Sequence, residues 1–136
     1  MIRIVLVMHE PLGAAFASCA RHVLGTEPDL VVFDVAPDAE PGEAARRLAV
    51  EVGGANSGSV LVLCDIFGAT PFNIAKKALT ILEKQGMSTH LVTGTNLCMV
   101  LKALTEQQEN PEQLSEDVRL GAVRGIVAAT STCPDS

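Results

Sequence analysis

The chain has 136 residues, of which 48% are hydrophobic and 19% charged, and its net charge is −6 at pH 7. This length and balance predict one globular domain, residues 1–136, that buries a core of its own and is not disordered. The acidic excess, with only ten Lys and Arg and no Trp or Tyr, excludes a basic surface of the kind that binds nucleic acid.

The N-terminal segment predicts a strand followed by a helix. Residues 2–8 form a continuous apolar run, typical of a strand covered on both faces. About six apolar residues before His9 are too few for a signal peptide or a membrane span, so we expect a cytoplasmic protein. A helix should begin near Pro11 and end at Gly25. Its expected buried stripe is Leu12, Phe16, Cys19 and Val23.

A second strand is expected at residues 29–35 and a second helix at residues 37–52. Asp34 lies inside this strand, where a carboxylate suits an exposed edge of a sheet and not a core. No function is predicted for Asp34. The inward-facing residues expected in the helix are Ala45, Leu48 and Val52.

Residues 60–64 form the most apolar strand, which predicts a central place in the sheet. Asp65 follows it directly. The next helix is expected to start at Thr70, whose hydroxyl suits a cap, with Pro71 in the first turn, and to end at Gly86. Its expected buried face is Phe72, Ala75, Leu79 and Leu82.

The rest of the chain predicts a fourth strand at 89–94, a helix capped by Asn96 that runs to about Gln108, and a last helix within 110–125. The apolar segment 126–130 is expected to be a short edge strand, antiparallel or supplied to another subunit. Strands that alternate with helices imply right-handed βαβ units. The predicted fold class is therefore α/β, an open, doubly wound and mostly parallel sheet with the order 2-1-3-4.

The cysteines are far apart in the sequence and form no C-x-x-C motif. Cys19, Cys64 and Cys98 have mostly apolar neighbours and are expected to be buried thiols. Cys133 lies in the polar tail and is expected to be exposed.

Metal and nucleotide sites are not expected. The histidines have no carboxylate or thiolate partner at helical spacing, and neither the P-loop nor the G-x-G-x-x-G motif is present. His22 is expected to be solvated and His90 to be structural.

A candidate site lies where the connections of the predicted sheet diverge, between strands one and three. This order places His9 and Asp65 side by side, and the carboxylate would accept the Nδ1 proton of the ring and leave Nε2 as a nucleophile. The helix N-termini after Pro11 and at Thr70 would favour an anion beside the pair. These residues predict a site for a phosphoryl group on His9.

Each candidate also has a purely structural explanation. His9 alone could be a polar residue at a strand end, Asp65 could cap the turn before Gly68, and Thr70 could serve only as a helix cap. Their joint position at one edge of the sheet favours a site.

Three features together resemble the IIA component of mannose-type (mannose, fructose and sorbose) sugar phosphotransferase systems: a first strand ending in His9, DIFGATPFN at 65–73, and VTGTNLCMVL at 92–101 with Gly94 and Asn96. The resemblance covers nearly the whole chain. It implies a phosphotransferase that acts as a phosphohistidine relay, with His9 accepting a phosphoryl group from the carrier protein HPr and passing it to a IIB component.

The resemblance also assigns the remaining roles. Asp65 would orient His9, while Gly68, Thr70 and Asn96 would bind the phosphoryl oxygens. No cofactor or metal is expected, because the phosphoramidate donor is itself reactive.

The resemblance implies a homodimer in which the segment 126–130 is exchanged between subunits. The expected partners are HPr and a separate IIB protein, since the sequence stops at Ser136 without a IIB domain. Association with a membrane permease would be indirect, and no nucleic acid is expected to bind.

The sequence departs from the usual pattern at Glu10 and Pro11, where a small residue more often follows the histidine. The Glu10 carboxylate would either repel an incoming phosphoryl group or face the partner. Two alternatives stay open: a regulatory protein in which phosphorylation of His9 gates partner binding without sugar transport, and a flavodoxin-like small-anion binder with a silent histidine.

Overall fold

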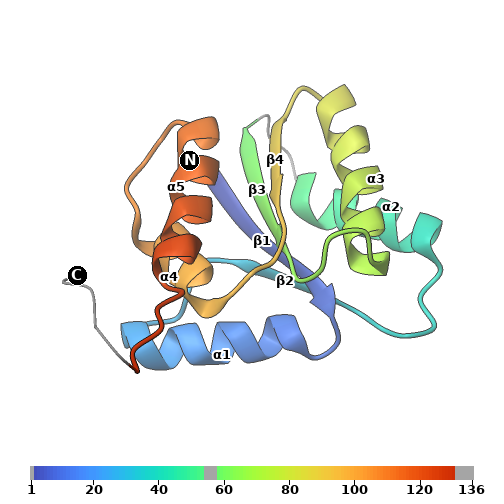
Figure 1. The fold of residues 1–136 in the computed structure, drawn as a ribbon. Helices are drawn as coiled ribbons and strands as arrows, with labels where there is room; N and C mark the ends of the chain where they lie inside the picture. The colour runs from blue at the N-terminus through green and yellow to red at the C-terminus, as the bar shows by residue number, and fades with distance from the viewer. Residues whose placement is uncertain (1, 54–57, 131–136) are drawn as a thin grey trace.

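The structure is a computed structural model that describes residues 2–53 and 58–130. Its elements alternate along the chain (Figure 1). They are β1 (Ile2–His9), α1 (Leu12–Leu24), β2 (Val31–Val35), α2 (Pro41–Gly53), β3 (Ser59–Cys64), α3 (Thr70–Lys84), β4 (Ser88–Val92), α4 (Leu97–Thr105) and α5 (Pro111–Arg124).

The strands form one four-stranded parallel sheet with the order β2-β1-β3-β4, so the predicted fold class is confirmed. The connection through α1 leads from β1 to β2 on one side, whereas those through α2 and α3 lead to β3 and then β4. The order therefore reverses between β1 and β3, whose carboxyl ends are neighbours.

Helices cover both faces of the sheet (Figure 1). On β1, Val5 and Val7 pack in the core under α2 and α3, whereas Leu6 and Met8 pack in the core under α1, α4 and α5. Since both faces are buried, the strand is apolar at every position from Ile4 to Met8.

Several predicted bounds differ at their ends. β2 begins at Val31, and α2 begins at Pro41 because the Glu40 carboxylate accepts hydrogen bonds from the N–H groups of Gly42 and Glu43. The inward face predicted for α2 is confirmed, since Ala45, Leu48 and Val52 are buried.

The buried face predicted for α1 is wrong in part: Phe16 packs against the core, but Leu12, Cys19 and Val23 are exposed. Leu12 is 37% exposed and Val23 is 56% exposed, whereas Gly13 and Ala20 are buried. Small residues face the sheet here because they let the helix approach it closely; a Cβ on Gly13 would lie 3.0 Å from Cγ1 of Val32 on β2. The spacing of apolar residues in the sequence does not reveal this close contact between α1 and β2.

The thiol predictions are confirmed in part. Cys64 is buried, as expected, but Cys19 and Cys98 are exposed on the outer faces of α1 and α4. The prediction for Cys133 lies outside the described residues.

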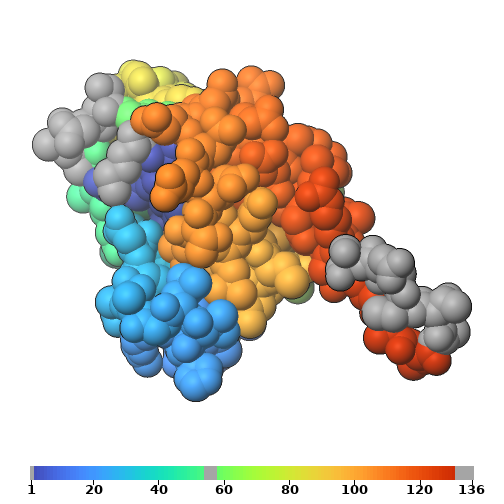
Figure 2. Space-filling view, turned by 90° about the vertical axis from the view of Figure 1, so that its left-hand side faces the viewer, coloured from blue at the N-terminus to red at the C-terminus, as the bar shows by residue number. Residues whose placement is uncertain are grey.

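The predicted fifth strand at 126–130 is not formed. These residues leave α5 as an irregular, exposed segment that projects from the body of the molecule (Figure 2), with Ile126 76% exposed and Val127 49% exposed. A strand is defined by its hydrogen-bonded neighbour, and this segment reaches no edge of its own sheet.

No helix within the described ranges combines the length and the apolar character that crossing a bilayer requires.

The central position of β3 generates a stability prediction. Leu63 is fully buried, so Leu63→Ala should lower the free energy of unfolding by about 2–5 kcal/mol through lost contacts and a residual cavity. Urea unfolding at neutral pH measures this value. The control Val50→Ala, at a side chain that is 78% exposed, should change it by less than about 0.5 kcal/mol. Equal effects of the two substitutions would contradict the described core.

Candidate functional site

The carboxyl ends of β1 and β3 bring His9 and Asp65 together, as the sequence predicts. Val7 pairs with Cys64 in the sheet, so the residues that follow on each strand are also neighbours. Oδ2 of Asp65 accepts a hydrogen bond from the backbone N–H of His9 at 2.9 Å and lies 2.7 Å from Nδ1 of its ring. One carboxylate oxygen therefore holds both the backbone and the ring of the histidine.

The Asp65 carboxylate is ionised at neutral pH. Burial raises the pKa of Asp65, but the hydrogen bonds from the backbone and ring of His9 and from the N–H of Ile66 outweigh this effect and leave the pKa below its usual value. An ionised carboxylate only accepts hydrogen bonds, so Nδ1 of His9 carries a proton, and in the neutral form of the ring Nε2 has a free lone pair.

Exposure differs sharply within the pair. The Asp65 side chain is 7% exposed, whereas the His9 side chain is 49% exposed. The carboxylate is therefore shielded from solvent while the ring it orients is accessible to a partner.

The loop from Asp65 to Thr70 turns sharply before α3. Oδ1 of Asp65 accepts from the N–H of Ile66 at 2.9 Å, and Gly68 has a φ of +82°. This is the left-handed region that glycine adopts without strain, which explains the residue at this position.

The predicted cap at Thr70 is wrong. Thr70 is already the first residue of α3, and Ala69 occupies the N-cap position without a side-chain hydrogen bond. A Thr70 cap requires the helix to begin at Pro71, but α3 begins one residue earlier, so this exposed hydroxyl is not engaged in capping.

The N-terminus of α3 keeps free hydrogen-bond donors. The N–H of Asn73 bonds to the carbonyl of Ala69, and Pro71 has no N–H. Among the described residues, the N–H groups of Thr70 and Phe72 have no backbone partner. Such donors and the positive end of the helix dipole favour an anion.

The N-terminus of α1 is different, which corrects the expectation that both helix ends favour an added anion. Oδ1 of Asp34 accepts from the N–H of Gly13 at 2.8 Å, and Oδ2 accepts from the N–H of Ala14 at 3.0 Å. A carboxylate of the protein already occupies this helix end. Asp34 does lie on an edge strand, as its position in the sequence predicts.

Asn96 is held near the pair by the loop after β4. The N–H of Gly94 donates to the carbonyl of Asp65 at 3.1 Å, and the hydroxyl of Thr95 donates to a carbonyl of β3 at 2.6 Å. The Asn96 side chain caps α4, with Oδ1 accepting from the N–H of Met99 at 3.0 Å. Because Oδ1 of Asn96 is used in this cap, the side-chain NH2 group of Asn96 is the part that could donate to a ligand.

Exposed apolar side chains surround the site, and sequence reasoning did not single them out. Ile66 is 57% exposed and Phe67 is 75% exposed, although both follow an apolar strand. The Phe67 ring packs against Phe72, with 4.9 Å between centroids. The sequence did contain a signal for this exposed apolar surface: two adjacent apolar residues in a strand-to-helix loop, where polar residues are usual.

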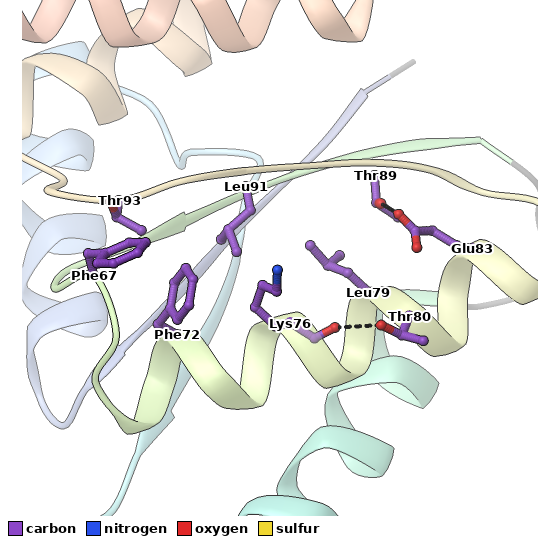
Figure 3. Close-up of a pocket in the computed structure, with 9 residues that line it drawn as sticks. All are labelled: Phe67, Phe72, Lys76, Leu79, Thr80, Glu83, Thr89, Leu91 and Thr93. Atoms are coloured by element: carbon purple, nitrogen blue, oxygen red, sulfur yellow. Dashed lines mark hydrogen bonds between the residues drawn. The ribbon is translucent and has the colours of Figure 1, made fainter.

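A groove of about 410 Å³ begins beside these rings and runs between α3 and β4 (Figure 3). Lys76 points into it, with Nζ 5.9 Å from the centroid of Phe72. Its floor includes Leu79 and Leu91. The groove is therefore mostly apolar from the aromatic rings to its centre and polar at the far end, where Thr80, Glu83 and Thr89 line it.

The other candidates lie outside this arrangement. His22 is exposed on α1, as expected, and His90 lies on β4 with Nε2 3.4 Å from the Ser88 hydroxyl. Burial, with a contribution from the Asp65 carboxylate, raises the pKa of Cys64 to about 12, so this thiol stays protonated. In the part of the chain that the structure describes, no cluster of three side chains could hold a metal ion.

The arrangement is suited to nucleophilic chemistry on an anion. It combines an accessible imidazole nitrogen, a carboxylate that fixes the ring and stabilises positive charge on it, and free N–H donors at α3.

Comparisons with known proteins identify the family of the chain and confirm its fold. The family model EIIA-man, described as PTS system fructose IIA component, matches residues 3–119. The structure is similar to phosphotransferase system component EIIA from Streptococcus agalactiae, with 26% identity, a TM-score of 0.83 and coverage of 94% of this chain and 97% of that chain. The search of curated proteins found no match.

Two further structures show the same fold at lower identity. The mannose/sorbose specific IIA subunit from Enterococcus faecalis has 21% identity, a TM-score of 0.83 and coverage of 98% of this chain and 97% of that chain. The PTS IIA protein associated with the fucose utilization operon from Streptococcus pneumoniae has 19% identity, a TM-score of 0.67 and coverage of 88% and 89%.

The bonded carboxylate generates a prediction for the dependence of stability on pH. Because the pKa of Asp65 is lower in the folded chain than its ordinary value of 3.8, its stabilisation is present above that pH and is lost as the pH falls through the folded value. Asp65→Asn should lower the free energy of unfolding by about 1.5–3 kcal/mol at pH 7, the range for a hydrogen bond to a charged group. Urea unfolding between pH 7 and pH 3 should show the difference shrinking; a constant difference would contradict the ionised, bonded carboxylate.

Proposed function

Because the chain belongs to the EIIA-man family of PTS system IIA components, we propose that it is a phosphocarrier that accepts a phosphoryl group on His9 from phospho-HPr and passes it to a separate IIB protein. The observation that carries the proposal is the 2.7 Å contact between Nδ1 of His9 and Oδ2 of Asp65, which leaves Nε2 as the free nucleophile.

The proposed transfer is a direct displacement between two nitrogen atoms. The lone pair on Nε2 of His9 attacks the phosphorus of the donor phosphohistidine as the donor N–P bond breaks, and the electron pair of that bond returns to the donor imidazole. The His9 ring gains positive charge while Nδ1 keeps its proton, and the Asp65 carboxylate stabilises this charge. Discharge to the IIB protein repeats the displacement with His9 as the leaving group.

The phosphoryl oxygens would be bound from the α3 side. The donors proposed are the Thr70 hydroxyl, the free N–H groups of Thr70 and Phe72, and the side-chain amide of Asn96. Gly68 contributes through its left-handed backbone, which sets the loop that aims these donors. Negative charge spreads over the equatorial oxygens in the transition state, so donors fixed in advance lower its energy.

Both partners are proposed to dock on the exposed apolar side chains around His9. Ile66 and Phe67 offer contact area directly beside the accessible ring, and exposed apolar patches of this kind are typical of protein interfaces. This scheme places the protein in the cytoplasm, uses no metal or cofactor, and connects it to a membrane permease only through the IIB protein.

A mass measurement tests the phosphoacceptor. After incubation with phosphoenolpyruvate, enzyme I and HPr, the wild-type chain should gain one acid-labile phosphoryl group. His9→Ala should gain none, because the nucleophile is absent, and Asp65→Ala should react at least about 10-fold more slowly, because the ring is no longer held in place. His22→Ala, at an exposed histidine on α1, is the matched control and should react like the wild type.

A phosphorylated His9→Ala protein would end the proposal. A wild-type adduct that no IIB protein discharges would support the regulatory alternative.

We also propose that the segment 126–130 pairs with a second copy of the chain. It is apolar, exposed and without a strand partner in its own sheet, while β4 leaves one edge of the sheet unpaired beside the groove lined by Leu79 and Leu91. Adding a strand there would cover both features.

The dimer has its own test. Ile126→Lys should shift sedimentation equilibrium from dimer to monomer, because a buried ammonium would oppose the pairing. Val23→Lys replaces another exposed apolar residue, on α1, and should leave the dimer intact. A wild-type chain that sediments as a monomer at all concentrations would refute the pairing.

A further inference from the structure

We propose that Asp34 is a positioning residue for phosphoryl transfer at His9: it holds the first turn of α1 from the neighbouring strand and neutralises that helix end, so that the phosphoryl group is directed to α3. This inference rests on the proposed function and extends it to a residue outside the site.

The first observation is that α1 has no cap of its own. Pro11 occupies the N-cap position, and its side chain makes no hydrogen bond. The carboxylate of Asp34, which is distant in the sequence, instead accepts from the N–H groups of Gly13 and Ala14. The start of α1 is therefore fixed to β2 and not to the residues that precede it.

The second observation is that β2 holds the whole connection between His9 and α1. Asp34 and Val35 pair with Met8 and His9 in the sheet. The carbonyl of Val35 then accepts from the N–H of Glu10 at 3.1 Å. The chain after His9 is therefore held to β2 at two places: at Glu10 through the carbonyl of Val35, and at the first turn of α1 through the carboxylate of Asp34.

Asp34 also lies unusually close to Gly13, in a space that only a glycine leaves open. A Cβ on Gly13 would collide with Oδ1 of Asp34 and would lie 3.0 Å from Cγ1 of Val32. Gly13 is buried and has no positive φ, so the space for the carboxylate, and not the backbone conformation, explains the glycine.

The negative charge of Asp34 disfavours binding of the phosphoryl group at the start of α1. Two helices begin next to the carboxyl ends of β1 and β3, and both would attract an anion through their N–H groups. Asp34 accepts from the N–H groups of Gly13 and Ala14 at α1, and its negative charge disfavours a second anion there, although the N–H of Leu12 has no such bond. At α3, among the residues that the structure describes, no carboxylate bonds to the N–H groups of Thr70 and Phe72. Of these two helix ends, α3 alone is left to receive the phosphoryl oxygens.

Glu40 provides a matched control within the same chain. Its carboxylate accepts from the N–H groups of Gly42 and Glu43 at the start of α2, which is the same two-donor arrangement at a helix that does not follow His9. Asp34→Asn and Glu40→Gln each replace one carboxylate oxygen by an amide group that cannot accept, so both weaken a helix cap.

The experiment compares these two variants in single-turnover phosphorylation by phospho-HPr, with mass spectrometry to measure the fraction phosphorylated at the end. Here kcat is the maximal rate constant of transfer to His9, and KM is the phospho-HPr concentration at half that rate. Asp34→Asn should reach full phosphorylation with a kcat lowered about 10-fold or more and an unchanged KM, because the ring is misplaced but the docking surface is intact. Glu40→Gln should keep kcat within about 2-fold of the wild type. A lower kcat in both variants, or an unchanged kcat in Asp34→Asn, would overturn the proposal.

Amide hydrogen exchange tests the anchoring without a donor. In the wild type, the N–H groups of Glu10, Gly13 and Ala14 should be protected, and in Asp34→Asn, but not in Glu40→Gln, all three should exchange faster. Unprotected wild-type amides would overturn the proposal even if Asp34→Asn fails to fold. Failure of the wild type to accept a phosphoryl group would refute the proposed function itself, whereas normal transfer by Asp34→Asn would refute only the role of Asp34.

Discussion

The carboxylate of Asp65 joins the ends of two neighbouring strands, and the candidate site depends on this interaction. One oxygen accepts from the backbone and ring of His9, and the other accepts from the first N–H of the loop that leads to α3. The same group thus bonds to the end of β1 from the end of β3, to the protonated nitrogen of the imidazole, and to the start of the loop that leads to α3. Because these bonds favour the ionised form more than burial disfavours it, the group is charged where its charge is needed.

The two helix N-termini next to this pair differ in what occupies them. Asp34 supplies a carboxylate to α1, and the N–H groups at the start of α3 stay free among the described residues. A strand-to-helix connection on each side of the pair would otherwise offer two competing places for an anion. We propose that this difference directs the phosphoryl group on His9 to the start of α3.

The segment beyond α5 and the loop at Ile66 and Phe67 expose apolar side chains for a different reason from those on α1. On α1, single residues such as Val23 are exposed because small residues occupy the face that contacts the sheet. Around His9 and after α5, pairs of apolar residues that are adjacent in sequence stay exposed in the part of the chain that the structure describes, although the Phe67 ring also contacts Phe72. These are the surfaces on which we propose that the partner proteins and a second copy dock.

Local patterns in the sequence determined the strands, the helices and a mostly parallel sheet, because continuous apolar runs and the residues at their ends depend only on burial and chain direction. The proximity of His9 and Asp65 followed from the strand order 2-1-3-4 expected for this fold class, which the structure confirms. The same patterns were insufficient for Asp34, Thr70 and the buried face of α1. Whether Thr70 is the cap or the first helical residue is a difference of one residue at a helix start. Whether Asp34 caps a helix and which side of α1 meets β2 each depend on contacts between segments that are distant in the sequence. Only the tertiary structure decided these features, since a hydrogen bond across elements has no periodic signature in the residues that make it.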